Sequence, residues 1–406
     1  MKISPNPRTA AVPGLLTQEF WALSVLSGLY FAGTGVLNAL MPTFVVDEIG
    51  GTEATAGTVM GVLAFSALLS RPFFGRMADR HGARRILIVG ALVSAASMAI
   101  LLVLSPSLPA AILSRLVLGA GGAAMFTGTT MRSLELAPPD RQSQAASFVL
   151  ISVHVGLGLG PILGFWVLGR FGYDQVWVAV AVLAMLSAGV ALLLTPTPTP
   201  SLPGTGRPPL IHRNALLPGV VTLFGVFAFN GFLTFASLYG REVGVGDIAL
   251  IFTALSGTII VVRLFAGGVP DRVGPIVAGS GALVVTIVAA LVVAFWANPT
   301  GLFVGAVLLA IGLSLQSPSF IPLAVTGVPD GERGSAMATF TGFYDIANAL
   351  VGPILGLIVA GVGFQAAFSF TAVMAFIALI ILVTAVAPRL RIRAAQDQRP
   401  GSTLEP

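Results

Sequence analysis

The chain has 406 residues, of which 56% are hydrophobic and only 9% charged, with a formal net charge of +5. This composition excludes a soluble globular protein, because a soluble surface normally needs about a quarter of the residues to be charged. Cysteine is absent, which excludes disulfides, thiolate nucleophiles and cysteine metal sites.

Twelve apolar runs follow one another along the chain, and each is long enough to form a membrane-spanning helix. Such a helix needs roughly 20 mostly apolar residues, because lipid offers no hydrogen-bond partner to the backbone. The predicted spans are residues 20–43, 55–73, 86–105, 109–131, 144–168, 174–195, 216–239, 247–266, 276–296, 300–323, 335–361 and 364–387.

The loops between the predicted spans are short, except for a proline- and glycine-rich segment after the sixth span. Proline and glycine at this density disfavour helix and are typical of a linker. We therefore predict an N-terminal six-helix half (1–195), a cytoplasmic linker (196–214), a C-terminal six-helix half (215–388) and a cytoplasmic tail (389–406).

Most of the 21 lysine and arginine residues lie in one set of loops and in the two termini. Cytoplasmic loops retain basic residues, so both termini are predicted to be cytoplasmic. All but one of the 21 basic residues are arginine, a bias that indicates a GC-rich bacterial genome, and we expect a multi-pass protein of the bacterial cytoplasmic membrane. The other set of loops is acidic and carries Asp47, Glu48, Glu53, Asp174, Glu242 and Asp247.

Residues 75–85 form a short charged run between the second and third spans, and the pattern of residues 71–82 returns 192 positions later. The chain therefore contains two copies of one six-helix design. The repeated residues are Arg71, Phe73, Gly75, Asp79, Arg80 and Gly82, which return as Arg263, Phe265, Gly267, Asp271, Arg272 and Gly274.

This glycine-framed Asp-Arg turn resembles the loop between the second and third helices of major facilitator superfamily transporters. One departure is Ala83, which stands where that family usually has a basic residue. The resemblance covers nearly the whole chain. It implies an all-α integral membrane protein with twelve helices in two pseudo-symmetric halves and a substrate site between them near the midplane.

In that family the loop acts as a conformational latch that braces the second helix against the start of the eleventh in the outward-open state. The alternative is that these are solvated loop charges that only follow the distribution of basic residues. Glu135 and Asp140 are candidate partners of Arg84. The latch residues implied by the resemblance are Gly75, Asp79, Arg80, Gly82, Arg84, Asp271 and Arg272.

Arg115 is the one arginine in the interior of a predicted span, the fourth, away from the span's ends. A guanidinium in lipid costs several kcal/mol unless it is paired or hydrated, so Arg115 is expected to face the central cavity. The surrounding sequence resembles the family's fourth-helix motif, which is associated with proton transfer in drug/proton antiporters. The alternative is an arginine that binds carbonyl groups of a neighbouring helix.

Asp345 is the only carboxylate in the interior of a predicted span, the eleventh. A carboxylate at that depth can take and release a proton near neutral pH, so Asp345 is the first candidate for proton coupling. His154, at nearly the same depth in the fifth span, is the alternative, because an imidazole titrates close to neutral pH. We expect Arg115 to approach Asp345 in one conformation and to favour its ionised form.

A glycine-rich motif in the fifth span resembles the motif that marks antiporters within the superfamily, which favours export. The alternative is close helix packing, since glycines four residues apart let two helix backbones touch, while proline bends a helix. The motif consists of Gly156, Gly160, Pro161 and Gly164, and part of it returns as Gly352, Pro353 and Gly356.

The helices that line the cavity of this fold carry scattered polar groups among apolar ones. A mostly apolar pocket of that kind suits lipophilic or amphipathic molecules. The predicted cavity residues are Tyr30, Thr34, Asn38, Thr127, Phe229, Asn230, Gln316 and Tyr344.

These observations favour a proton-coupled exporter of small lipophilic or amphipathic molecules. The alternative within transport is a proton-coupled importer of a small metabolite. An enzyme is disfavoured, because the three histidines are far apart in sequence and only one acid lies inside a span. The expected partners are a small-molecule substrate, protons and the lipid bilayer, with no nucleic acid, cofactor or metal, and we expect a monomer.

Overall fold

The computed structural model describes residues 17–137, 142–196, 211–266, 268–329 and 332–389. These residues form helices without a strand, and twelve spans are long and apolar enough to cross a membrane, as predicted. The N-terminal half contains α1 (Gln18–Asp47), α2 (Glu53–His81), α3 (Ala83–Leu104), α4 (Leu108–Glu135), α5 (Gln142–Phe171) and α6 (Tyr173–Ala191).

The C-terminal half repeats this order, with its first span broken into two helices at Val226. A five-residue π-helical turn, Leu382–Val386, follows its last helix. The elements are α7 (Arg213–Gly225), α8 (Phe227–Glu242), α9 (Ile248–Ala266), α10 (Val269–Val273), α11 (Pro275–Phe295), α12 (Pro299–Val325), α13 (Arg333–Val362) and α14 (Phe364–Ile381).

Several helices extend beyond the predicted spans, because hydropathy marks only the apolar part of a helix. The second helix continues to His81, where residues 55–73 were predicted. The seventh span begins at Arg213, so the end of the predicted linker is helical. His212 caps this helix through its ring Nδ1, which accepts a hydrogen bond from the Asn214 amide at 3.3 Å. Residues 197–210 of the linker lie outside the described residues.

The internal repeat is visible in the backbone. The second helix of the first half ends at Gly82, whose φ is +79°, and the equivalent Gly274 has a φ of +88°. This left-handed region is costly for a residue with a Cβ atom, which explains why both copies have glycine here. At these points α3 follows α2 and α11 follows α10 without an intervening loop.

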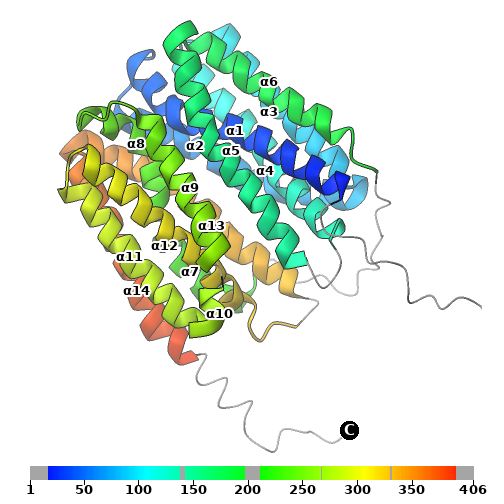
Figure 1. The fold of residues 1–406 in the computed structure, drawn as a ribbon, viewed down its shortest axis with the longest axis vertical. Coiled ribbons are helices and arrows are strands. Elements are labelled where there is room, and N and C mark those ends of the chain that lie inside the picture. Colours follow the sequence, from blue (N-terminus) through cyan, green and yellow to red (C-terminus); the bar gives the residue numbers. More distant parts are fainter. Residues whose placement is uncertain (1–16, 138–141, 197–210, 267, 330–331, 390–406) are drawn as a thin grey trace, which may run out of the picture.

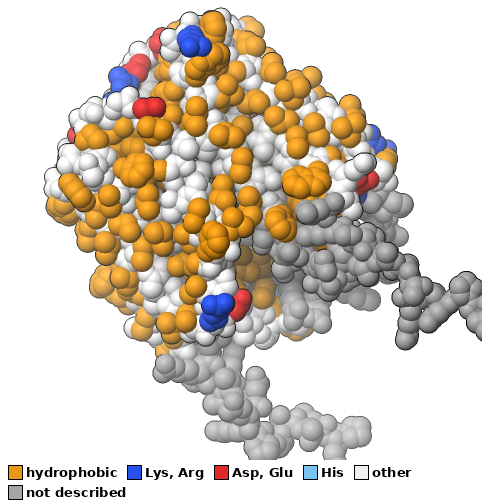
Figure 2. Space-filling view, viewed as in Figure 1, with side chains coloured by type: hydrophobic (Ala, Val, Ile, Leu, Met, Phe, Trp, Pro, Cys, Tyr) orange, Lys and Arg blue, Asp and Glu red, His pale blue; other side chains and the backbone are white. Residues whose placement is uncertain are grey.

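Figure 1 shows the two halves side by side, with the blue-to-green N-terminal half to the upper right of the yellow and red helices. Two symmetry-related helix pairs join them: α2 packs on α13, and α5 packs on α9. A third contact joins α1 and α8. The face shown in Figure 2 is mostly apolar, with few charged side chains, as expected for a surface in lipid.

The halves meet closely at the end of the bundle that carries Asp47 and Glu53, here called the acidic end. A Cβ atom on Gly57 would overlap the Gly352 carbonyl, and one on Gly356 would stand 2.8 Å from the Glu53 carbonyl. Arg241 forms an ion pair with Asp47 across the same boundary. The backbones of α2 and α13 therefore touch, and we call the contact of Gly57 with Gly352 the acidic-end seal.

The opposite end, here called the arginine-rich end, is less tightly joined. Cβ atoms added at Gly75 of α2 or Gly342 of α13 would meet no atom within 4 Å. The hydrogen bonds, ion pairs and glycine contacts found between the halves lie from the acidic end down to Arg71. The two halves are therefore closed against each other at one end in this conformation.

Arg132 forms a buried polar cluster at the arginine-rich end of the N-terminal half, which the sequence did not indicate. Its guanidinium is 1% exposed and binds Glu135 at 2.9 Å, Glu19 at the start of α1 and the Thr195 carbonyl at 3.1 Å. One arginine of α4 therefore holds the ends of the first and sixth spans.

We expect Arg132→Gln to lower the melting temperature of the detergent-solubilised protein. Glutamine cannot replace the charged hydrogen bonds to both carboxylates, a loss of about 2 kcal/mol. Arg80→Gln, which changes an exposed arginine of α2, should leave the melting temperature unchanged. Equal melting temperatures for Arg132→Gln and the wild-type protein would show that the cluster does not stabilise the fold.

Candidate functional site

An ion pair joins the two halves at the limit of their contact farthest from the acidic end. Arg71 of α2 donates from Nη2 to Oδ1 of Asp345 on α13, at 2.8 Å. Asp345 is 4% exposed, and its Oδ2 is buried with no partner among the described residues. The Arg71 guanidinium also lies 5.1 Å from the centre of the Phe126 ring of α4. Asp345, which was predicted as a site residue, therefore lies on the boundary that must move in alternating access.

Arg115 does not take the place that we expected for it. It is fully buried inside the N-terminal half, where Nη2 donates to the Leu37 carbonyl of α1 at 3.1 Å and contacts the Met60 sulfur of α2 at 3.1 Å. In this conformation the arginine at Asp345 is Arg71. The contacts of Arg115 fit the alternative role, that of holding a carbonyl of a neighbouring helix.

His154 lies near the same interface on α5. Its Nδ1 is 2.7 Å from the Leu150 carbonyl, and since a carbonyl can only accept, Nδ1 carries the hydrogen. The ring is within electrostatic reach of Arg263 on α9. Thus Asp345 is paired with an arginine of the opposite half, and His154 is within electrostatic reach of another.

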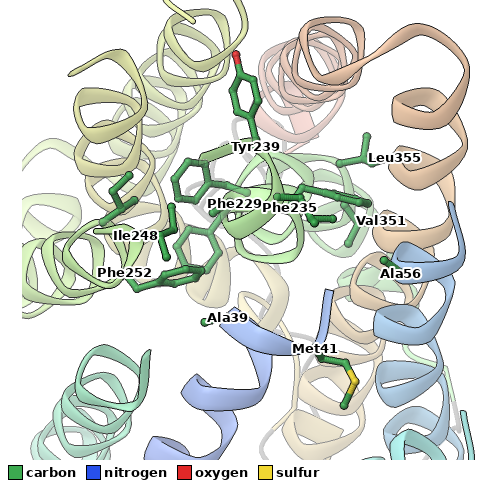
Figure 3. Packing of buried hydrophobic residues seen from close by; sticks show 14 of the residues in the cluster. Ala39, Met41, Ala56, Phe229, Phe235, Tyr239, Ile248, Phe252, Val351 and Leu355 are labelled. Carbon is green, nitrogen blue, oxygen red and sulfur yellow. The ribbon is translucent and has the colours of Figure 1, made fainter. Parts of the chain in front are cut away.

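A small cavity lies between the halves, next to His154. Asn38 and Phe229 were predicted to line the substrate pocket, and both line this cavity. Figure 3 shows Phe229 of α8 close to Phe252 of α9, with Ala39 of α1 facing them. The described lining residues are Gly35 and Asn38 of α1, His154 and Leu157 of α5, Phe229 and Leu233 of α8, and Phe252, Leu255, Ser256 and Ile259 of α9.

The other predicted cavity residues are not among those that line this cavity. Tyr30 forms a hydrogen bond of 3.1 Å with Ser94, inside the N-terminal half. Gln316 donates to Thr286 at 2.9 Å, inside the C-terminal half. These two contacts correct the prediction, because each side chain faces its own half. The remaining predicted residues outside the lining are Thr34, Thr127, Asn230 and Tyr344.

The glycine motif of the fifth span packs helices closely together, which was the alternative to its role as a mark of antiporters. Cβ atoms on Gly156 and Gly160 would overlap backbone carbonyls of α1, and one on Gly164 would stand 2.9 Å from the Val36 side chain. The repeated Gly352 and Gly356 instead contact α2 of the opposite half. The same sequence therefore packs within one half in its first copy and between the halves in its second. Pro161 and Pro353 lie inside α5 and α13.

The latch residues are only partly described. Arg84 donates to the Leu192 carbonyl at 2.8 Å, and the described partner of Glu135 is Arg132, which corrects the predicted pairing of Arg84 with Glu135. Asp140, Gly267 and the side chain of Asp79 lie outside the described residues. The exposed latch residues are Arg80, Asp271 and Arg272.

Two packed halves of six helices, with a cavity and an ion pair between them, are typical of a membrane transporter. The model of the Major Facilitator Superfamily matches residues 23–351 and 243–405. The chain belongs to this superfamily, and it is a transporter rather than an enzyme.

Relatives of similar length occur in bacteria. The chain is 27% identical to the uncharacterized MFS-type transporter STM4428 of Salmonella typhimurium, covering 89% of this chain and 94% of the relative. It is 29% identical to the uncharacterized MFS-type transporter YhhS of Escherichia coli, covering 86% and 87%. The bacterial relatives and the apolar helices place the chain in a bacterial membrane as a multi-pass protein.

Solved transporters share the fold at low sequence identity. The peptide transporter POT in complex with alafosfalin has a TM-score of 0.78 and 15% identity over 91% of this chain and 94% of that chain. The human organic anion transporter MFSD10 has a TM-score of 0.68 and 17% identity over 90% and 100%. At these identities the likeness defines the fold alone.

Proposed function

We propose that the protein is a proton-coupled exporter of small lipophilic or amphipathic organic molecules that works by alternating access. The observation that carries this proposal is the ion pair between Arg71 and Asp345. It joins the halves at a carboxylate that is 4% exposed, and it depends on the charge of that carboxylate. A proton on Asp345 removes the charge and weakens the pair.

A proton can drive motion only if it binds one conformation better than the other. Here Arg71 stabilises the ionised form of Asp345 while the halves are in contact, and the attraction falls when α2 and α13 separate. Protonation therefore favours the separated arrangement. His154, which lines the cavity, is the second candidate for proton exchange, and Arg115 supports the N-terminal half by binding α1.

The proposed orientation places the arginine-rich end in the cytoplasm, following the distribution of basic residues. The acidic-end seal then faces outward, and the structure corresponds to the state that is open to the cytoplasm. The repeated loop with Asp79, Arg80 and Gly82 would close that side as a latch in the opposite state. The direction of export is supported by the resemblance of the motif at Gly156 and Gly160 to that of antiporters.

Everted membrane vesicles with an acidified interior and an acid-sensitive dye test this function. An exported compound added outside would enter in exchange for protons, so the dye signal should recover with wild-type protein but not with Asp345→Asn. A panel of lipophilic and amphipathic compounds would be screened in this way. Recovery only for compounds preloaded inside would indicate import with protons, and no recovery beyond vesicles lacking the protein would contradict proton coupling.

A further inference from the structure

Two arginines occupy equivalent positions in the two halves, but only one has a carboxylate partner. Arg71 of α2 and Arg263 of α9 are 192 positions apart and repeat one another. Arg71 binds Asp345, whereas the residue equivalent to Asp345 in α5 is Val153. Within the described residues, Arg263 makes no hydrogen bond or ion pair, and its Nε is buried.

Arg263 is not among the residues that line the cavity between the halves, but it lies close to them along α9. On α9, Arg263 lies one helical turn after Ile259, which lines the cavity. It is within electrostatic reach of His154, another lining residue, and of Tyr344 on α13. Tyr344 is also within electrostatic reach of Arg71, so the two arginines border the same region from opposite halves.

The charges of this region do not balance. The charges of Arg71 and Asp345 cancel, while Arg263 contributes a positive charge for which the described residues supply no carboxylate at hydrogen-bond distance. Arg263 is half-buried, and only its Nε is fully enclosed. A guanidinium that is free to bind a ligand holds a carboxylate through two parallel hydrogen bonds. An anionic ligand in the cavity would supply the missing partner.

The apolar walls of the cavity favour a ligand whose remaining part is apolar. Its walls include Leu157, Phe229, Leu233, Phe252 and Leu255, which offer contacts to an apolar body. We propose that Arg263 binds the acidic group of the substrate and that the substrate is an amphipathic organic anion with a single acidic group. This inference rests on the proposed function and names its substrate class. Because Asp345 already occupies Arg71, one acidic group matches the one unpaired guanidinium.

Binding in detergent, without any gradient, tests this assignment. The probes are matched sets with one apolar body and three head groups: naphthylacetate, naphthylacetamide and naphthylethylamine, and phenylbutyrate with its amide and amine. Wild-type protein should bind the anions more tightly than their amides or amines. Arg263→Gln should weaken anion binding about 10- to 100-fold and leave the amides unchanged, because only the charged hydrogen bonds are lost.

Two further variants distinguish the effects of charge and of side-chain geometry on anion binding from an effect on folding. Arg263→Lys keeps the charge but lacks the planar fork, so its anion affinity should lie between those of Arg263→Gln and the wild-type protein. Arg170→Gln changes an arginine that lies over the Trp166 ring at the acidic end, and it should bind the anions as the wild-type protein does. Ligand-free Arg263→Gln should melt no lower than the wild-type protein, because it loses an unpaired charge.

The inference is overturned if no anion of the panel binds better than its amide and amine, or if Arg263→Gln binds the anions with wild-type affinity. Proton-coupled export of neutral or cationic compounds that does not depend on Arg263 would also overturn it, and the proposed function would stand. Conversely, anion binding that depends on Arg263 without proton release in the vesicle assay would support the site and contradict the proton coupling.

Discussion

Asp345→Asn should abolish uphill accumulation of substrate in proteoliposomes while leaving exchange across the membrane. Asparagine keeps the size of the side chain and can still accept a hydrogen bond from Arg71. It cannot take or release a proton, so an imposed pH gradient has no group on which to act at this interface. Accumulation driven by the gradient should fall to passive equilibration, and counterflow of labelled substrate should persist. Both are measured on the same proteoliposomes, with a compound identified in the vesicle screen.

Two further variants serve as controls for the loss of accumulation in Asp345→Asn. Asp174→Asn removes an exposed carboxylate at the acidic end and should accumulate substrate as the wild-type protein does. His154→Gln should show a milder loss than Asp345→Asn. Full accumulation by Asp345→Asn would exclude Asp345 as the coupling residue, and a collapse confined to His154→Gln would assign the coupling to the histidine.

Gly57→Val should prevent closure of the acidic end and stop transport. Even a single Cβ atom at this position would overlap the Gly352 carbonyl, and valine adds two further methyl groups. Overpacking typically costs about 1–3 kcal/mol, so the closed state should be depopulated about 10-fold or more. Gly57→Ala should have a smaller effect in the same direction.

Cysteine labelling can measure this closure directly, because the native chain contains no cysteine. Ser237 is 1% exposed and binds the Ala39 carbonyl of the opposite half. A Ser237→Cys reporter should react slowly with a membrane-impermeant maleimide and at least ten times faster when Gly57→Val is added. The control is Gly169→Val, whose Cβ atom would meet no atom within 4 Å. Equal labelling in all three backgrounds would show that the seal does not control access.

The fold could be predicted from the sequence because its signals are long and redundant. Each span is an apolar run of sufficient length, and the repeat of 192 positions fixes two equivalent halves. The break at Val226 was not predicted, because no proline lies within one turn of it and residues 223–229 carry no polar side chain. The end of α2 was placed too early, since the charges after Arg71 were interpreted as a loop rather than as the polar end of a helix.

The early end given to α2 also left Arg71 out of the predicted site. Asp345 could be found because a carboxylate inside a membrane span is costly and is therefore rarely present without a functional role. Its partner was sought in Arg115, in the interior of a span, while Arg71, near the end of its predicted span, was counted among the cytoplasmic basic residues. The directions of Tyr30 and Gln316 could not be predicted, because a membrane helix with apolar residues all around gives no periodic signal of which face meets the cavity.

The acidic-end seal also bears on how the cell conserves energy. Where Gly57 meets Gly352, backbone lies against backbone and the apolar Phe235 ring lies next to the contact, so no room is left for a water molecule between the two helices. A proton therefore has no hydrogen-bonded chain along which to hop through this contact. We therefore expect a carrier that rests in this state to exclude ions far smaller than any substrate and to preserve the proton-motive force of the membrane between cycles.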